Sequence, residues 1–198
     1  AEIEAIAGLR AGHVRIVSFP SGAATVLPSA LGAMSKSFPG VTFSLGEAEP
    51  DEALRLLRRG ECDIALVYEY LRSAGPSERI QLESDEVAIP LVDERLHVAL
   101  PSDHALTAQR RIRVVDLAND RWVAGCPACR GNLDALCSSV GFSPDVCFVT
   151  DDYIALQRLV AEGLGVALVP ELMFLAGRET SRLQLRVIEP ACIRRVQA

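Results

Sequence analysis

The chain has 198 residues, of which 49% are hydrophobic and 23% charged, and its formal net charge is −6. This composition is close to the globular average, so we expect one or two domains around a buried core. No apolar run approaches the roughly 18 residues that span a bilayer, and we expect no membrane contact. The negative charge argues against a surface that wraps nucleic acid by itself, because such surfaces cluster Lys and Arg.

Six cysteines stand at positions 62, 126, 129, 137, 147 and 192. Their uneven spacing, in a chain long enough to fold without disulfides, is untypical of a secreted scaffold. We therefore expect reduced thiols and a cytoplasmic protein. The chain starts in a helix-like segment and ends in a strand-like one, so we also expect a fragment of a longer protein.

The stretch 13–45 predicts a strand, a helix and a second strand. The first strand is the apolar run 14–17, the helix begins near Ser21, and the second strand covers 41–45. The apolar positions of the helix define its expected inner face: Leu27, Leu31, Met34 and Phe38. A right-handed crossover between parallel strands places the start of this helix at the carboxyl edge of the sheet, where such sheets bind ligands.

A short amphipathic helix at 51–59 and a buried strand at 63–68 continue this α/β pattern, followed by a weak strand at 80–82. The apolar runs 87–91 and 96–100 are either one bent strand or two, and we place a crossing between domains there.

The second half repeats the pattern. We expect a loop at 101–109, solvated arginines at 110–113, a helical turn at 114–118, strands at 122–124, 146–150, 166–169 and 183–188, helices at 129–140 and 152–162, and a helical turn at 170–175. The sequence thus predicts an α/β fold of two lobes. The chain would cross between them twice and leave a cleft between their carboxyl edges.

The turn after the first strand contains Ser18, Phe19, Pro20, Ser21 and Gly22. A hydroxyl beside a helix N-terminus suits a carboxylate, a phosphate or a polar carbonyl group. Ser21 either contacts such a ligand or caps its own helix. In the second lobe the corresponding position is Thr150, and Asp151 or Asp152 then caps the following helix.

The segment Cys126-Pro127-Ala128-Cys129 can be interpreted in three ways. It is a redox pair at a helix start, half of a zinc site, or two small residues in a tight turn. No further residues show zinc-ligand spacing, so we predict no metal and no cofactor. Motifs of nucleophilic, phosphate-binding and metal catalysis are missing as well, which argues against an enzyme.

The segments GLRAGHVRIVSFPSGAATVLPSALGAMSKSFPGVTFSL, LLRRGECDIAL and TDDYIALQRLVAEGLGVALVPEL resemble the effector-binding domain of bacterial LysR-type transcriptional regulators. The resemblance covers about residues 8 to 190. It implies two Rossmann-like subdomains joined by two crossover strands, as in type 2 periplasmic binding proteins. Residues 1–11 would end a linker helix, 12–92 and 188–198 would form subdomain I, and 93–187 subdomain II.

The resemblance also implies a small-molecule inducer, for which we expect an organic anion. Its contacts would be Ser18, Phe19, Pro20, Ser21 and Gly22 in one lobe and Gly125, Cys126, Cys129 and Thr150 in the other. Helices 25–38 and 152–162 would form the contact of a homodimer, or of a homotetramer. Promoter DNA would be bound only through an N-terminal helix-turn-helix outside this chain.

Two alternatives stay open. A transport-type solute-binding protein predicts an export signal upstream and a monomer, whereas a regulator predicts an upstream helix-turn-helix. Peroxide sensors of the same family carry cysteines near the position of Cys129, with a partner further along where Cys137 stands. This keeps a thiol switch open, through Cys129 with Cys126 or Cys137.

Overall fold

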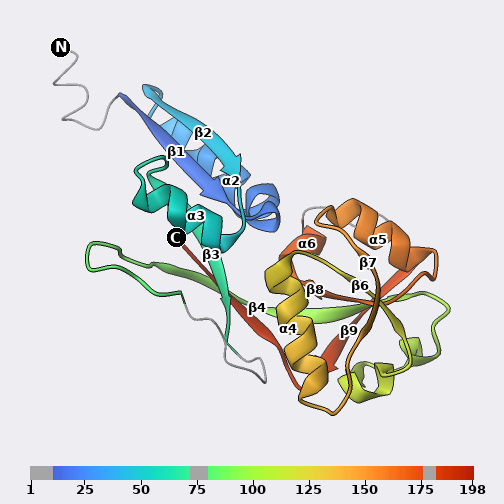
Figure 1. The fold of residues 1–198 in the computed structure, drawn as a ribbon. Helices are drawn as coiled ribbons and strands as arrows, with labels where there is room; N and C mark the ends of the chain where they lie inside the picture. The colour runs from blue at the N-terminus through green and yellow to red at the C-terminus, as the bar shows by residue number, and fades with distance from the viewer. Residues whose placement is uncertain (1–10, 72–79, 176–181) are drawn as a thin grey trace. The chain divides into compact units, whose positions relative to one another are not determined.

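The computed structural model describes residues 11–71, 80–175 and 182–198, which form two compact units (Figure 1). Unit 1 is drawn from Ala1–Tyr68, Leu82–Leu91 and Val196–Ala198, and unit 2 from Glu69–Gln81 and Val92–Arg195. The predicted linker-helix end lies outside the described residues, except for Ala11. The bounds that we predicted for the two subdomains stay a prediction.

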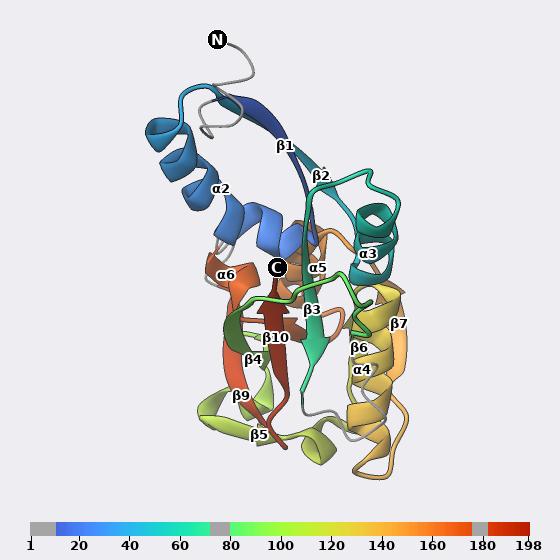
Figure 2. The same cartoon turned by 90° about the vertical axis from the view of Figure 1, so that its left-hand side faces the viewer.

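Unit 1 contains β1 (Gly12–Ser18), α2 (Pro20–Ser37), β2 (Val41–Glu47), α3 (Pro50–Arg58) and most of β3 (Ile64–Tyr70). Strand β1 pairs in parallel with β2 on one side and with β3 on the other. Helices α2 and α3 lie on opposite sides of these strands (Figure 2). The predicted βαβ unit is therefore confirmed, and it places the start of α2 directly after the carboxyl end of β1.

The predicted inner face of α2 is wrong beyond its first half. Leu27 is buried, whereas the side chains of Met34 and Phe38 are 42% and 38% exposed. The axis of α2 diverges from β1 and β2 toward its C-terminal end (Figure 2), the end at which these two exposed side chains lie. Helical periodicity identified which residues form the apolar stripe of α2, but it did not show how far along the helix that stripe is buried.

Unit 2 contains most of β4 (Pro90–Pro101), η1 (Ala105–Ala108), β5 (Arg111–Arg113), η2 (Val114–Leu117), β6 (Arg121–Ala124), α4 (Pro127–Ser138), β7 (Asp145–Val149), α5 (Tyr153–Ala161), β8 (Ala167–Pro170), α6 (Leu172–Leu175), β9 (Leu183–Glu189) and most of β10 (Ile193–Gln197). Strand β4 runs antiparallel to β8 and β9, and β6 is parallel to β7. Strand β10 lies between β3 and β4 in the strand order.

Of the two alternatives for the runs at 87–91 and 96–100, the single strand is confirmed: both contribute to β4, whose first residue is Pro90. Two other local expectations are wrong. Residues 80–82 form no strand. The arginine cluster that we read as a solvated loop contains β5, because Arg111–Arg113 pairs in parallel with β9 and Arg111 binds Glu189 at 2.9 Å.

The core of unit 2 surrounds Trp122, whose side chain is fully buried on β6. Leu133 and Leu136 of α4 pack in the same cluster, and Leu156 and Val160 of α5 pack in a second one. These contacts fix the starts of both helices beside the strands that precede them. Among the described residues, none of the helices has the length and hydropathy to span a membrane.

Candidate functional site

The turn at the start of α2 is tightly closed within unit 1. Phe19 has extended backbone angles at the N-cap, and its carbonyl accepts hydrogen bonds from the backbone N–H groups of Gly22 and Ala23, both at 3.0 Å. The Ser18 hydroxyl donates to the same carbonyl at 3.0 Å. Ser21 therefore lies inside the first helical turn and is not the N-cap. The capping role that we considered for it is wrong.

Gly22 is required by the closeness of this turn. A Cβ atom built on Gly22 would lie 2.7 Å from the Ser18 hydroxyl oxygen and 2.9 Å from the Phe19 ring. The side chains of Ser18, Phe19 and Ser21 are fully buried, and Pro20 is partly exposed. The five predicted residues are thus held together in one turn, and the two serine side chains within it are buried.

The Phe19 ring is fixed from the side of β3. Tyr68 contacts it edge-on, with the ring centroids 5.0 Å apart, and the Tyr68 hydroxyl donates to Glu49 at 2.8 Å. A carboxylate just before α3 therefore supports the aromatic residue just before α2. Neither Tyr68 nor Glu49 was singled out from the sequence, because both are distant in the chain from Phe19.

The turn at the start of α4 in unit 2 uses sulfur as a cap. Cys126 is the N-cap, and its Sγ accepts a hydrogen bond from the backbone N–H of Cys129 at 3.3 Å. The two Sγ atoms are 2.7 Å apart. Gly125 lies under Cys129, since a Cβ atom on Gly125 would lie 3.5 Å from the Cys129 sulfur. Cys126 is buried, and Cys129 and Gly125 are partly exposed.

Thr150 lies beside this turn, because its backbone N–H donates to the carbonyl of Ala124 at 3.0 Å. Its side-chain oxygen accepts a hydrogen bond from the N–H of Asp152 at 3.2 Å. Asp152 caps α5 by accepting from Ile154 and Ala155, as we predicted for one of the two aspartates. The structure therefore brings Gly125, the two cysteines and Thr150 together at one edge of unit 2.

Tyr70 is a neighbour of this turn that the sequence did not reveal. Burial, and then the negative charge of a Cys129 thiolate, raise the pKa of Tyr70 well above its ordinary value, and its hydroxyl is hydrogen-bonded to Cys129. Tyr70 precedes Cys129 by 59 residues, and nothing in the local pattern marks it.

A buried ion pair lies near Tyr70. Arg194 of β10 donates to Glu94 of β4 at 2.6 Å, and both side chains are at least 96% buried. Glu94 also accepts from the backbone N–H of Leu172 at 2.9 Å. Burial by itself lowers the pKa of Arg194, but the Glu94 carboxylate, together with Tyr70 and Tyr153, outweighs it, and the net pKa is raised. Arg194 is therefore a permanent cation beside the Tyr70 hydroxyl.

Arg130, the other cation near the turn, binds both carboxylate oxygens of Asp134 at 2.9 Å. This pair favours a structural role over anion binding. Among the described residues, no group of three or more His, Cys, Asp or Glu side chains is placed to hold a metal ion.

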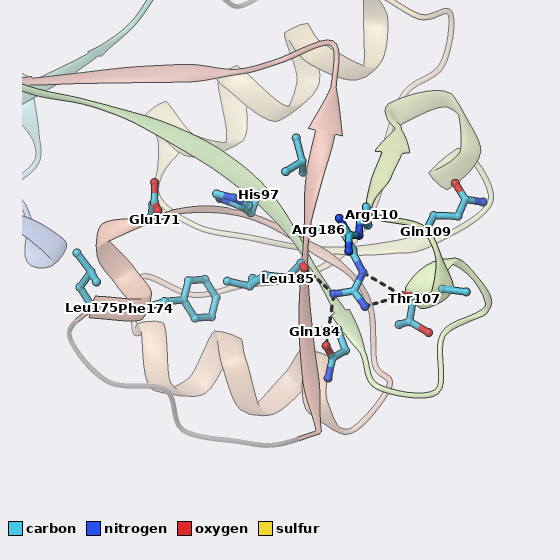
Figure 3. A pocket seen from close by; sticks show the side chains of 12 residues that line it. His97, Thr107, Gln109, Arg110, Glu171, Phe174, Leu175, Gln184, Leu185 and Arg186 are labelled. Carbon is cyan, nitrogen blue, oxygen red and sulfur yellow. Dashed lines mark hydrogen bonds between the residues drawn. The ribbon is translucent and has the colours of Figure 1, made fainter.

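A hollow of about 940 Å³ opens elsewhere in unit 2, between η1, α6 and β9 (Figure 3). Arg186 crosses it and donates to the carbonyls of Thr107 and Leu185 at 2.9 and 2.7 Å (Figure 3). Its guanidinium thus ties η1 to β9. None of the predicted site residues lines this hollow.

Two α/β units whose strands β4 and β10 each run from one unit into the other define the class of type 2 periplasmic-binding-protein-like domains. The chain belongs to the LysR substrate binding domain family, whose profile matches residues 7–198. The HTH-type transcriptional regulator YybE of Bacillus subtilis is 27% identical over 196 residues, which are 98% of this chain. The chain spans 63% of the length of that relative.

Solved structures share the fold. The C-terminal domain of a probable LysR family regulator from Rhodococcus sp. RHA1 superposes with a TM-score of 0.76 at 23% identity, covering 94% of this chain and 90% of that one. The effector binding domain of QuiR, solved in complex with shikimate, gives 0.75 at 18% identity, covering 95% of this chain and 87% of that one.

Proposed function

We propose that this chain is the effector-binding domain of a bacterial LysR-type regulator that acts in the cytoplasm, without catalysis, and binds promoter DNA through a helix-turn-helix outside the chain. The observation that carries the proposal is the turn at the start of α4, where Gly125, Cys129 and Thr150 are partly exposed around a helix N-terminus in a chain of this family. An effector acts by binding two arrangements of such a domain with different affinities.

We further propose that the effector is a small organic anion bound by residues of both turns. Helix starts offer N–H groups and a partial positive charge, which suit carboxylates and phosphates. The side-chain oxygens of Ser18 and Thr150 are each held by a hydrogen bond to the backbone and need little reordering. The shikimate complex of QuiR supports a carboxylate ligand for this fold.

A thermal-shift screen against small carboxylates and phosphate esters, shikimate among them, tests this proposal. A ligand at about 100 times its Kd stabilises by about 2.7 kcal/mol, which for a chain of this size raises the Tm by roughly 5–10 °C. Thr150→Val and Ser21→Ala should each reduce the shift at a fixed ligand concentration.

Each variant has a matched control. Ser139→Ala removes a hydroxyl that binds only the carbonyl of Leu136 at the far end of α4, and Ser29→Ala removes an exposed hydroxyl from α2. Both controls should keep the full ligand shift. A screen in which no organic anion stabilises the wild-type chain would contradict the proposed ligand class.

A further inference from the structure

The turn at the start of α4 holds two thiols in near-bonding contact. The Sγ atoms of Cys126 and Cys129 are 2.7 Å apart, and both residues carry thiols in this structure. A disulfide bond is about 2.05 Å long, so closing it requires a shift of less than about 1 Å. We infer that Cys126 and Cys129 form a reversible disulfide and that this turn is a site of thiol oxidation by hydroperoxides.

The surroundings of the pair favour a reactive thiolate. Cys126 occupies the N-cap of α4, and Cys129 lies in the first turn, where the helix carries partial positive charge. The Tyr70 hydroxyl is hydrogen-bonded to Cys129, and Arg194 contributes a buried positive charge nearby. Helix starts and nearby cations are typical surroundings of reactive cysteines in proteins, and a hydrogen bond donated to a thiolate stabilises the charged form.

The two sulfurs differ in access. Cys126 is 3% exposed, whereas Cys129 is partly exposed. Cys129 is therefore the sulfur that meets the oxidant, and Cys126 is the one that resolves the product.

Cys137 is excluded as the partner. It lies eight residues after Cys129 on the same helix, about 12 Å along the axis, whereas bridged residues have Cα atoms within about 7 Å. It is fully buried in the core around Trp122, and this burial raises the pKa of its thiol to about 12. A disulfide from Cys129 to Cys137 would require α4 to unfold, and one to Cys126 would not.

The reaction balances without a cofactor. The Cys129 thiolate attacks one oxygen of a hydroperoxide, forming a sulfenic acid, while the O–O bond breaks and the leaving alkoxide or hydroxide takes a proton. The Cys126 thiol then attacks the sulfenic sulfur, and water leaves. Two thiols and one hydroperoxide thus give one disulfide, one alcohol or water, and one water. A dithiol reductant reverses the change.

This inference is independent of the organic-anion proposal, because a chain that binds no effector still oxidises at this pair. The test treats the reduced, folded chain with one equivalent of hydrogen peroxide, alkylates the remaining thiols, and maps the tryptic peptides by mass spectrometry. Cleavage at the flanking arginines places Cys126 and Cys129 in peptide 122–130 and both Cys137 and Cys147 in peptide 131–158, where fragment ions distinguish the two. We expect peptide 122–130 to lose two hydrogen atoms, to lack alkylation, and to regain both thiols with dithiothreitol.

Variants assign the two sulfurs. Cys126→Ser should stop at a Cys129 sulfenic acid that dimedone captures, and Cys129→Ser should keep Cys126 alkylatable. Cys137→Ser is the matched control from the same helix and should oxidise like the wild type. Cys147 is the internal reference, because it is a partly buried thiol that donates to the carbonyl of Trp122 at 3.3 Å.

Two outcomes would overturn the inference. One is a crosslink between peptides 122–130 and 131–158. The other is oxidation of Cys147 as fast as that of Cys129 in wild-type protein whose circular dichroism shows it to be folded. The wild-type peptide map decides both, so a variant that fails to fold leaves the inference testable.

Discussion

Single atoms decide the geometry of both turns. At the start of α2 the missing Cβ of Gly22 makes room for the Ser18 hydroxyl and the Phe19 ring. At the start of α4 a sulfur replaces the oxygen that usually caps a helix, and the N-cap is therefore also a redox-capable group. Contacts within each turn therefore constrain the residue types at these positions, as much as a bound ligand would.

Gly22→Ala should destabilise the chain. The added methyl group meets the Ser18 oxygen and the Phe19 ring in a buried turn, and such overpacking costs about 1–3 kcal/mol. Gly32→Ala is the control in the same helix: no atom lies within 4 Å of its Cβ, so the change should stabilise by about 0.5–1 kcal/mol. Urea unfolding measures both, and equal effects of the two substitutions would refute the argument.

Arg194→Met should lower the free energy of unfolding by about 3–5 kcal/mol, because it leaves the carboxylate of Glu94 buried without its cation. The double variant with Glu94→Leu should recover most of the loss. It stays short of the wild type by about 1–3 kcal/mol, because the N–H of Leu172 loses its acceptor. Denaturant titrations at neutral pH measure this cycle, and a single variant that loses under about 1 kcal/mol would contradict it.

At the scale of elements, strand ends and helix starts place every predicted ligand residue. β1 leads into α2, β6 into α4 and β7 into α5, each through a turn of one to three residues. A charged pair links the middle of β1 to the residue that precedes β3. Arg15 of β1 donates to Asp63, just before β3, at 2.7 and 3.2 Å, and the backbone N–H of Arg15 donates to the same carboxylate.

The pH dependence of the Arg15–Asp63 ion pair follows from the direction of the pKa shift of Asp63. The hydrogen bonds from Arg15 lower the pKa of Asp63 from 3.8 to about 2, so the ionised form is the one favoured by folding. Its contribution is complete above pH 4 and is lost as the pH falls toward 2. The difference in unfolding free energy between wild type and Asp63→Asn should therefore shrink between pH 4 and 2.

Carbon-detected NMR titration checks the same point directly. The Asp63 carboxyl should titrate near pH 2 in the wild type, and Arg15→Met should move its pKa upward toward 3.8. An unchanged titration in Arg15→Met would show that other groups set this pKa.

At the scale of the whole molecule, the fold leaves apolar side chains exposed on both units. Met34, Phe38 and Leu45 are exposed on unit 1, and Val149 and Ile154, at 67% and 60%, on unit 2. We propose that α2 and α5 form the contact of a homodimer or homotetramer. Apolar side chains exposed in one chain become buried in such an interface.

Met34→Glu and Ile154→Glu should each weaken this association, because each places a charge in an apolar contact. Sedimentation velocity should show a lower average mass than for the wild type at equal concentration. Val87→Glu is the matched control, since Val87 is 81% exposed but lies outside both helices. A monomeric wild type, or equal loss in Val87→Glu, would contradict the proposed contact.

Sequence patterns determined the α/β class, the order of the elements and the positions of both turns, because periodicity and turn residues act locally. They also pointed to Asp152 as one of two caps. The predictions from sequence patterns were wrong where the structure of a segment depends on which other segments pack against it. Half of the predicted inner face of α2 is exposed, and a strand, β5, exists only because β9 lies beside Arg111–Arg113.

The sequence by itself determined which residues follow each strand, and hence which side chains stand at helix starts. Only the tertiary structure decided what surrounds them. It buried Ser21 and brought Tyr70 to Cys129 across 59 residues. Spacing along a chain fixes distance within one helix, but contact between distant segments depends on how the whole core packs.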